Sequence, residues 1–113
     1  MRSNRTASET EAQVKNKGPS PDFQRPIVRL LDLLGRRWTL RVLWELRDGE
    51  AFTFRVLQER CGGLSSSVLS ARLAELRDAG IVERAGGGYR LSASGRALEE
   101  PLLALNAWAN RRM

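Results

Sequence analysis

A three-residue junction between two helical patterns constrains the fold of this chain more than any other feature. The apolar residues Val56, Leu57 and Cys61 mark one face of a short helix, and a leucine stripe after residue 65 marks a longer helix. Only Gly62-Gly63-Leu64 separates the two. Helices joined this closely are typical of a helix-turn-helix.

The helix after the junction is predicted over residues 65–80, and a hairpin is predicted directly after it. A serine at the start can cap this helix, and Gly80 ends it. The following segment contains two short strand patterns around Ala85-Gly86-Gly87-Gly88, whose glycines supply the positive φ angles of a tight turn. We expect this hairpin, residues 81–91, to form the wing of a winged helix. The predicted buried stripe of the helix is Leu69, Leu73 and Leu76, widened by Val68 and Ala79.

Two further helices are predicted before the junction. The first begins at Pro26, which suits the first helical position, and ends before Gly35. Thr39 is expected to cap the second helix, and Gly49 closes it. A short strand is predicted between this helix and the next, at residues 51–54. The apolar residues of the first helix are Ile27, Leu30, Leu31 and Leu34.

The last helix is predicted from a cap at Ser92, with a kink at Pro101 because proline lacks an amide donor. Residues 1–24 contain few large apolar side chains and cannot bury enough surface to offset the entropy of ordering, so they are predicted to form a flexible tail. Residues 25–113 then form one mainly α domain with a small β-hairpin, a winged helix-turn-helix. The apolar residues of the last helix are Leu98, Leu102, Leu105 and Trp108.

The residue types argue against an enzyme. The chain has one cysteine and no histidine, which excludes an intrachain disulfide, a multi-cysteine metal site and histidine-based catalysis. Its carboxylates occur singly, without a paired or phosphate-binding motif. We therefore expect no catalytic residue, no metal and no cofactor. Cys61 is interpreted as a small buried hydrophobe, and Trp38 and Trp44 as core anchors.

No apolar run approaches the roughly 18 residues that a membrane-spanning helix needs. The polar N-terminus is not followed by the apolar segment of a secretory signal, so a cytoplasmic protein is expected. The net charge of +6 comes almost wholly from 17 arginines. Arginine binds phosphate or guanine through a planar fork, so a phosphate-rich partner is plausible, although basic composition also fits proteins without a nucleic-acid partner.

Taken in order, the residues resemble the HxlR-type branch of winged helix-turn-helix regulators, within the wider circle of MarR-like proteins. The likeness covers residues 25–110, and it implies a homodimeric DNA-binding transcriptional regulator, either repressor or activator, without enzyme activity. Its segments are Gly35-Arg36-Arg37-Trp38-Thr39-Leu40, Phe54 with Leu57, Gly63-Leu64-Ser65, Leu69-Ser70, Arg72-Leu73 with Glu75-Leu76, Ala79-Gly80-Ile81-Val82-Glu83-Arg84, Tyr89-x-Leu91-Ser92-x-x-Gly95-Arg96-Ala97-Leu98, and Pro101.

Three features depart from the family pattern. Many members have a cysteine immediately before the proline of the first helix, and some use it to sense reactive compounds. This chain has Arg25 there, so sensing by a thiol is impossible at that position. The wing is shorter than usual, and its glycine tip has no side chain to insert into a minor groove. Ser67 and Ala74 stand where relatives often have basic residues.

The outward face of helix 65–80 is predicted to enter the major groove of DNA. Its serines can contact base edges or phosphate, although they also fit simple capping and solubility, and Ala71 can contact a thymine methyl group. Arg72 could reach DNA or could pair with Glu75 or Glu45. Arg55, Arg84 and Arg90 are the better phosphate candidates. The predicted DNA contacts are Ser65, Ser66, Ser67, Ser70, Ala71, Arg72, Arg77, Arg55, Arg84 and Arg90.

The first and last helices carry more apolar surface than a three-helix core needs, so they are predicted to pair across a two-fold axis. Packing of these two helices against each other within one chain is the alternative. A rival function is a winged-helix protein-interaction module without DNA contact. The predicted dimer interface is Ile27, Leu31, Leu34, Leu102, Leu105 and Trp108.

Overall fold

The computed structural model describes residues 25–113, and the predicted flexible tail, residues 1–24, lies outside them. The chain divides into two units, one ending at Leu34 and the other comprising Gly35–Met113. In the first unit, helix α1 spans Pro26–Leu34, which confirms both predicted ends. The carbonyl of Arg25 accepts hydrogen bonds from the Val28 and Arg29 amides and so closes the first turn.

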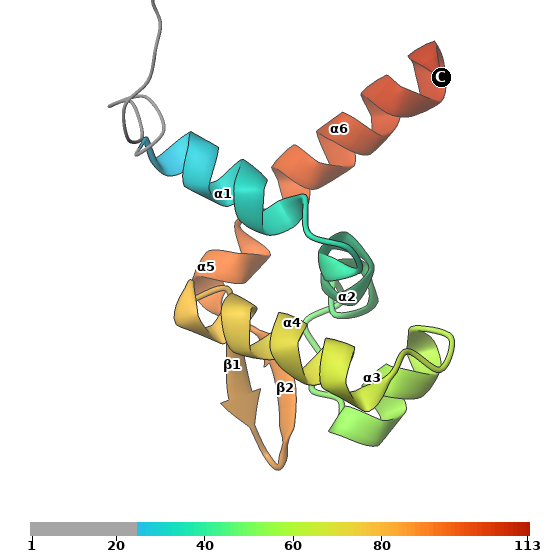
Figure 1. Ribbon diagram of the computed structural model, residues 1–113. Coiled ribbons are helices and arrows are strands. Elements are labelled where there is room, and N and C mark those ends of the chain that lie inside the picture. The colour runs from blue at the N-terminus through green and yellow to red at the C-terminus, as the bar shows by residue number, and fades with distance from the viewer. Residues whose placement is uncertain (1–24) are drawn as a thin grey trace, which may run out of the picture. The chain divides into compact units, whose positions relative to one another are not determined.

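The second unit is a winged helix-turn-helix, as the sequence predicts (Figure 1). Helix α4 packs against α2 and against strand β1, while α2 also contacts α3 and α5 contacts β2. The core is built from leucines of the helices together with Ile81, Val82 and Leu91 from the wing. The elements are α2 (Thr39–Glu45), α3 (Phe54–Arg60), α4 (Ser66–Asp78), β1 (Val82–Ala85), β2 (Gly88–Leu91), α5 (Ala93–Arg96) and α6 (Glu99–Arg112).

The predicted junction between α3 and α4 is confirmed. Gly62 and Gly63 have φ angles of 79° and 81°, the left-handed conformation that favours glycine and ends α3. The Ser65 hydroxyl accepts a hydrogen bond from the Val68 amide at 3.3 Å and caps α4. The stripe Leu69, Leu73 and Leu76 is buried as predicted. Val56 and Ala79 are predicted to belong to the apolar faces of their helices. Both predictions are wrong, because both residues are exposed.

The wing is a two-stranded antiparallel hairpin that turns through Gly86 and Gly87, both with positive φ. Val82 pairs with Leu91, Glu83 with Arg90 and Arg84 with Tyr89. The strand predicted at residues 51–54 is reduced to a single bridge between Phe52 and Tyr89. The reason is local: Thr53 accepts a hydrogen bond from the Val56 amide and caps α3, so Phe54 is already helical.

The predicted single helix after Ser92 is two helices, and the kink expected at Pro101 is absent. The break falls at residues 97–98, between α5 and α6, and Pro101 is the third residue of α6. The amides of the first helical turn have no acceptor within the helix, so proline is tolerated there without bending it. The Ser92 hydroxyl caps α5 by accepting from the Gly95 amide at 3.0 Å, as the sequence predicts.

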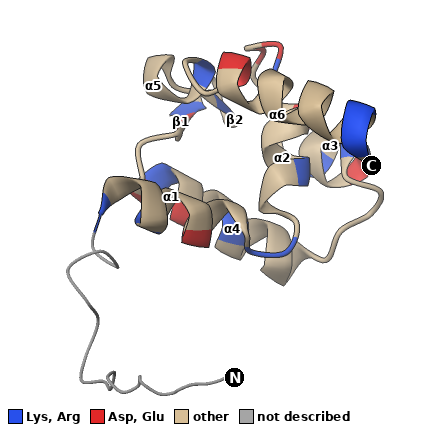
Figure 2. Cartoon of the chain, turned by 90° about the horizontal axis from the view of Figure 1, so that it is seen from above, with Lys and Arg blue, Asp and Glu red and all other residues tan. Residues whose placement is uncertain are grey.

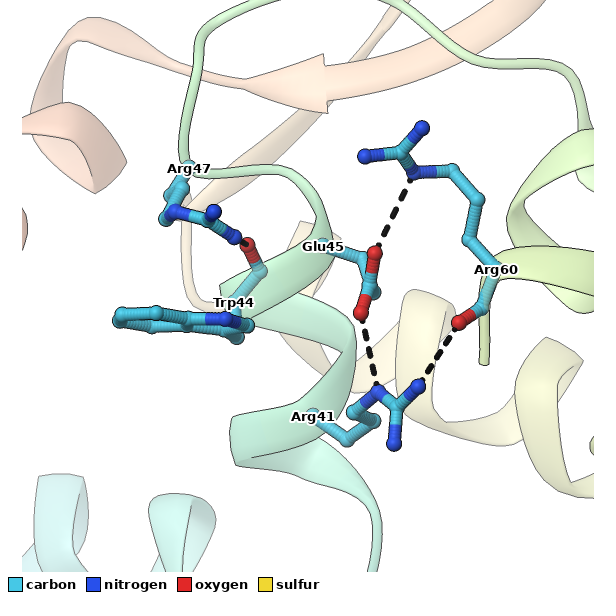
Figure 3. Close-up of polar contacts among 5 residues, drawn as sticks. All are labelled: Arg41, Trp44, Glu45, Arg47 and Arg60. Carbon is cyan, nitrogen blue, oxygen red and sulfur yellow. Dashed lines mark hydrogen bonds and ion pairs between the residues drawn. The ribbon is translucent and has the colours of Figure 1, made fainter. Parts of the chain in front are cut away.

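Helix α2 begins from an unusual residue. Trp38 has a φ of 78°, rare for a bulky side chain, and Thr39 is the first helical residue instead of the predicted cap. Trp44 is 41% exposed, so its interpretation as a core anchor is wrong. It stands on the outer side of α2, with the Arg47 guanidinium 4.2 Å above its ring (Figure 3).

A charged cluster ties α2 to α3. The Glu45 carboxylate accepts a hydrogen bond from Arg41 Nε at 3.0 Å and forms an ion pair with Arg60 Nε at 3.3 Å (Figure 3). Arg41 also donates to the carbonyl of Arg60 at 2.9 Å. Both guanidiniums are therefore committed to the fold.

Within residues 25–113, no helix is long and apolar enough to cross a membrane, and no group of acidic, histidine or cysteine side chains could hold a metal ion.

Candidate nucleic-acid interface

The N-terminal half of α4 presents an uncharged, hydroxyl-rich surface. Ser66, Ser67 and Ser70 are exposed, Ala71 is half-buried, and the buried leucines fix this face outward. Ser65 holds the first turn as the N-cap. The remaining first-turn amides have no partner within the helix and point along its positive dipole end. This turn can therefore donate hydrogen bonds to a phosphate or a base.

Gln58 connects the end of α3 to this first turn. Its side-chain Nε2 donates to the carbonyl of Leu64 at 2.8 Å and to the Ser66 hydroxyl at 3.2 Å. Its backbone carbonyl accepts a hydrogen bond from the Gly63 amide at 2.9 Å. One residue thus holds the turn at three points and sets where α4 begins. No pattern in the sequence indicates this role, because Gln58 belongs to no apolar stripe and no capping position.

Arg72 is turned toward the protein. Its side chain is only 20% exposed, and its Nε lies 3.6 Å from a carboxylate oxygen of Glu75. The other oxygen of Glu75 accepts a hydrogen bond from Arg36 at 3.3 Å. Of the two ion pairs that the sequence leaves open for Arg72, the structure contains the one with Glu75. The alternative partner, Glu45, is bound by Arg41 and Arg60.

Two arginines at the ends of the helix-turn-helix remain accessible. The Arg55 side chain is 83% exposed, and its ion pair with Glu59, at 3.7 Å, joins two exposed groups. Such pairs contribute little and open readily. Arg77 is exposed in the last turn of α4 and pairs with no residue in the described part of the chain. Both can approach an external phosphate at little cost.

The two wing arginines lie on opposite faces of the hairpin. Residues directly opposite in an antiparallel pair share a face, and successive residues alternate between faces. Glu83 pairs with Arg90 on one face, and Arg84 pairs with Tyr89 on the other. Arg90 Nε donates to the Glu83 carboxylate at 2.7 Å, whereas the Arg84 guanidinium lies 5.0 Å from the centre of the Tyr89 ring. The Glu83 carboxylate therefore offsets the positive charge of Arg90, whereas Arg84 contacts an uncharged ring.

Helix α6 has no buried residue and extends away from α3, α4 and the hairpin (Figure 1). Between Glu99-Glu100 in its first turn and Arg111-Arg112 in its last, it carries no charged side chain (Figure 2). Leu105 is 61% and Trp108 50% exposed. Leu102 is half-buried.

A groove of about 400 Å³ lies between α2 and α6. No local sequence pattern indicates this groove, because its lining residues lie far apart in the chain. In α1, described by itself, Ile27 and Leu31 are more than half exposed, whereas Leu34 is only 8% exposed and offers little surface to a second copy. The apolar lining of the groove includes Leu40, Leu43, Trp44, Leu98, Leu102 and Leu103.

Cys61 is buried between the charged cluster and the core, as the sequence predicts. Burial raises the pKa of its thiol above the ordinary value, and the nearby Glu45 carboxylate raises the pKa further. Arg41 and Arg60 oppose this effect in part. A thiol held protonated and out of solvent is a poor nucleophile.

Comparison with known proteins places this geometry in a family. A model of the HxlR-like helix-turn-helix family matches residues 33–113. Over 88 residues, the chain is 33% identical to an uncharacterized HTH-type transcriptional regulator of Synechocystis, sll1512, covering 72% of the chain and 64% of that relative. It is 30% identical over 96 residues to the HTH-type regulator YvaP of Bacillus subtilis, covering 79% of the chain and 84% of YvaP.

Two solved structures share the fold. The quinone-bound YodB of B. subtilis is 33% identical with a TM-score of 0.71, covering 75% of this chain and 96% of that one. A possible HxlR family transcriptional factor from Thermoplasma volcanium is 32% identical with a TM-score of 0.60, covering 78% and 87%. The chain spans just under two thirds of the Synechocystis relative and most of the other three proteins.

Proposed function

The chain belongs to the HxlR-like helix-turn-helix family, and from this premise we propose that it is a transcriptional regulator that binds two-fold symmetric duplex DNA as a homodimer. Helix α4 enters the major groove and the wing lies along the phosphate backbone. The relatives from Synechocystis and B. subtilis are bacterial regulators, so the cytoplasm, which holds the DNA in bacteria, is the proposed compartment. No reaction is assigned to the protein.

The observation that carries this proposal is the exposed first half of α4. A helix that contributed only to the core would not need three exposed serines on its outward side, directly after a turn held by hydrogen bonds. Ser65 caps the helix, Gln58 holds the turn, and Ser66, Ser67 and Ser70 face solvent. Hydroxyl groups and helix N-terminal amides are common donors to phosphates and base edges.

The positive charge for binding comes from the neighbours of α4. Arg55 precedes the turn, Arg77 ends α4, and Arg84 is the wing contact that the geometry favours over Arg90. Arg72 contributes to the fold through Glu75. This division supports an electrostatic grip at the flanks of the groove and hydrogen bonding at its centre.

The dimer is supported by unpartnered apolar surface. Exposed Leu105 and Trp108 line a helix without buried residues, and the groove beside α2 widens that apolar area. Scattered exposed leucines are ordinary, but a continuous apolar face of this kind marks an interface. For both α4 helices to enter successive major grooves on one side of the duplex, the dimer must place them about 34–36 Å apart, one turn of the DNA helix.

Thiol sensing is not carried over from the solved relatives. YodB has been solved bound to quinone and after diamide treatment, and HypR is a redox regulator solved in its reduced form. In this chain the only cysteine is Cys61, which is buried and whose pKa is raised. We propose that regulation of this protein does not proceed through a cysteine.

Selection of bound sequences from a randomised duplex pool tests the proposal. Enrichment of a two-fold symmetric motif, with binding that weakens steeply as salt rises, is the expected result. The absence of any bound duplex at low salt would overturn it and favour the protein-interaction module instead.

Two substitutions that each introduce a negative charge test the assignment of α4 to the major groove. Ser67→Glu puts a negative charge on the proposed groove face and is expected to abolish binding of the enriched duplex. Ser94→Glu puts the same charge on an exposed site of α5 and is the matched control. Equal effects of the two substitutions would contradict the placement of α4 in the groove.

A further inference from the structure

Only one orientation of the Gln58 side-chain amide is compatible with its two hydrogen-bond partners. The Leu64 carbonyl can only accept, so the Gln58 atom 2.8 Å from it must be the amide nitrogen. An amide nitrogen carries two hydrogens and no acceptor site. Its second short contact, to Ser66 Oγ at 3.2 Å, is therefore also a donation. The carbonyl of the turn thus fixes the orientation of the whole amide group.

The donation from Gln58 determines the direction in which the Ser66 hydroxyl can donate its own proton. A serine oxygen has one proton and two lone pairs, and Gln58 occupies one lone pair. The proton cannot point back at the amide, so it is directed away from Gln58. Ser66 is exposed and is the first residue of α4, on the face proposed to meet DNA. The neighbouring Ser65 hydroxyl is used differently, because it accepts from the Val68 amide as the helix cap.

We propose that Gln58 is a positioning residue of the DNA interface, which holds the Ser66 hydroxyl as a hydrogen-bond donor toward an acceptor of the duplex. The acceptor is a phosphate oxygen or an acceptor on a base edge, such as N7 of a purine. Gln58 itself touches no DNA in this arrangement. This inference rests on the proposed function, since it requires that α4 bind duplex DNA.

A double-mutant cycle measured by DNA binding tests the proposal. The probe is a fluorescent duplex carrying the sequence enriched from the randomised pool. All factors are given per half-site, because both subunits of the dimer carry each substitution. Ser66→Ala is expected to weaken binding about fivefold, the usual effect of one lost hydrogen bond. Gln58→Met, which leaves the hydroxyl free to rotate, is expected to weaken it about threefold. The double variant is expected to bind like Ser66→Ala alone, because Gln58 acts through Ser66.

If Gln58→Met weakened DNA binding only by destabilising the fold, the cycle would give a different result. The Thr53 cap of α3 provides the control. Thr53→Ala removes the α3 cap, which costs about as much stability as the loss of the Gln58 contacts, without touching Ser66. Its effect on binding is expected to be the same with serine or alanine at position 66. If Gln58→Met also weakens the Ser66→Ala protein threefold, giving about fifteenfold in total, Gln58 acts only through the fold and the proposal is overturned.

The same variants separate the two sources of the acceptor. If Ser66 donates to a phosphate, Ser66→Ala weakens binding to the enriched duplex and to a scrambled duplex at low salt by the same factor. If Ser66 donates to a base, only the enriched duplex is affected. Wild-type protein that binds neither duplex would overturn the proposed function and this inference together. Wild-type binding with no effect of Ser66→Ala would overturn this inference alone.

Discussion

Replacement of Gly95 by alanine is expected to destabilise the protein by about 2–4 kcal/mol, although alanine is the better helix former. Gly95 is a buried residue of α5 packed against the backbone at the start of the wing. An ideal Cβ at this position would overlap the carbonyl oxygen of Ile81 and would lie 3.0 Å from the carbonyl carbon and 3.1 Å from Cγ2 of that residue. Carbon–oxygen contacts become comfortable near about 3.3 Å, so relief of the overlap with the Ile81 oxygen requires the two segments to separate by about 1 Å or more.

The size of the effect follows from what that separation disturbs. Overpacking of this kind costs about 1–3 kcal/mol. Two hydrogen bonds join the same segments, from the Ser92 amide to the Ile81 carbonyl at 2.9 Å and from the Ser92 hydroxyl to the Gly80 carbonyl at 2.6 Å. Weakening them removes about 1 kcal/mol each. Alanine in place of glycine returns about 1 kcal/mol through helix propensity. The steric effect therefore exceeds the propensity effect.

Thermal unfolding followed by circular dichroism measures the outcome. Gly95→Ala is expected to lower Tm by on the order of 10 °C or more, given about 4–8 °C per kcal/mol for a domain of this size. Ser94→Ala, at the preceding exposed position of the same helix, is the control and is expected to leave Tm nearly unchanged. A Tm for Gly95→Ala equal to or above that of wild type would refute the reasoning.

Three further predictions concern the thiol, the wing and α6. Because burial and the Glu45 charge raise the pKa of Cys61, a smaller fraction of the thiol is ionised in the folded chain than in the unfolded chain. Iodoacetamide at about pH 8.5 is therefore expected to alkylate the folded chain at least about tenfold more slowly than the urea-unfolded chain. Equal rates would contradict the burial. Arg84→Ala is expected to reduce the slope of log affinity against log salt by about 1.8, because each subunit of the dimer loses one phosphate contact worth about 0.9, and Arg90→Ala by clearly less; equal reductions would show that both faces of the wing approach phosphate. Trp108→Glu is expected to convert a dimer to a monomer in light scattering after gel filtration, and an unchanged mass would exclude α6 as the interface.

The sequence alone determined most of the secondary structure, because the signals for it are local. Pro26 and Gly35 delimit α1, and the paired glycines between α3 and α4 require a conformation that few other residues adopt. The leucine stripe of α4 follows directly from the helical period. The failures were also local: Thr53 caps α3 where a strand was predicted, and Pro101 falls in a first helical turn where its missing amide has no consequence.

Only the tertiary structure decided which side chains remain for a partner. From the sequence, Arg84 and Arg90 are equal phosphate candidates, and Arg72 is open between DNA and an ion pair. In the fold, Arg72 forms an ion pair with Glu75, Arg90 is paired with Glu83, and Arg84 lies against the Tyr89 ring on the opposite face. The first half of α4 was recognisable from its serines, yet the polarity of one hydroxyl depends on Gln58, a residue of another helix. A pattern along the chain reports the period of a helix or strand, whereas ion pairs, faces and donor directions depend on residues that meet only when the chain has folded.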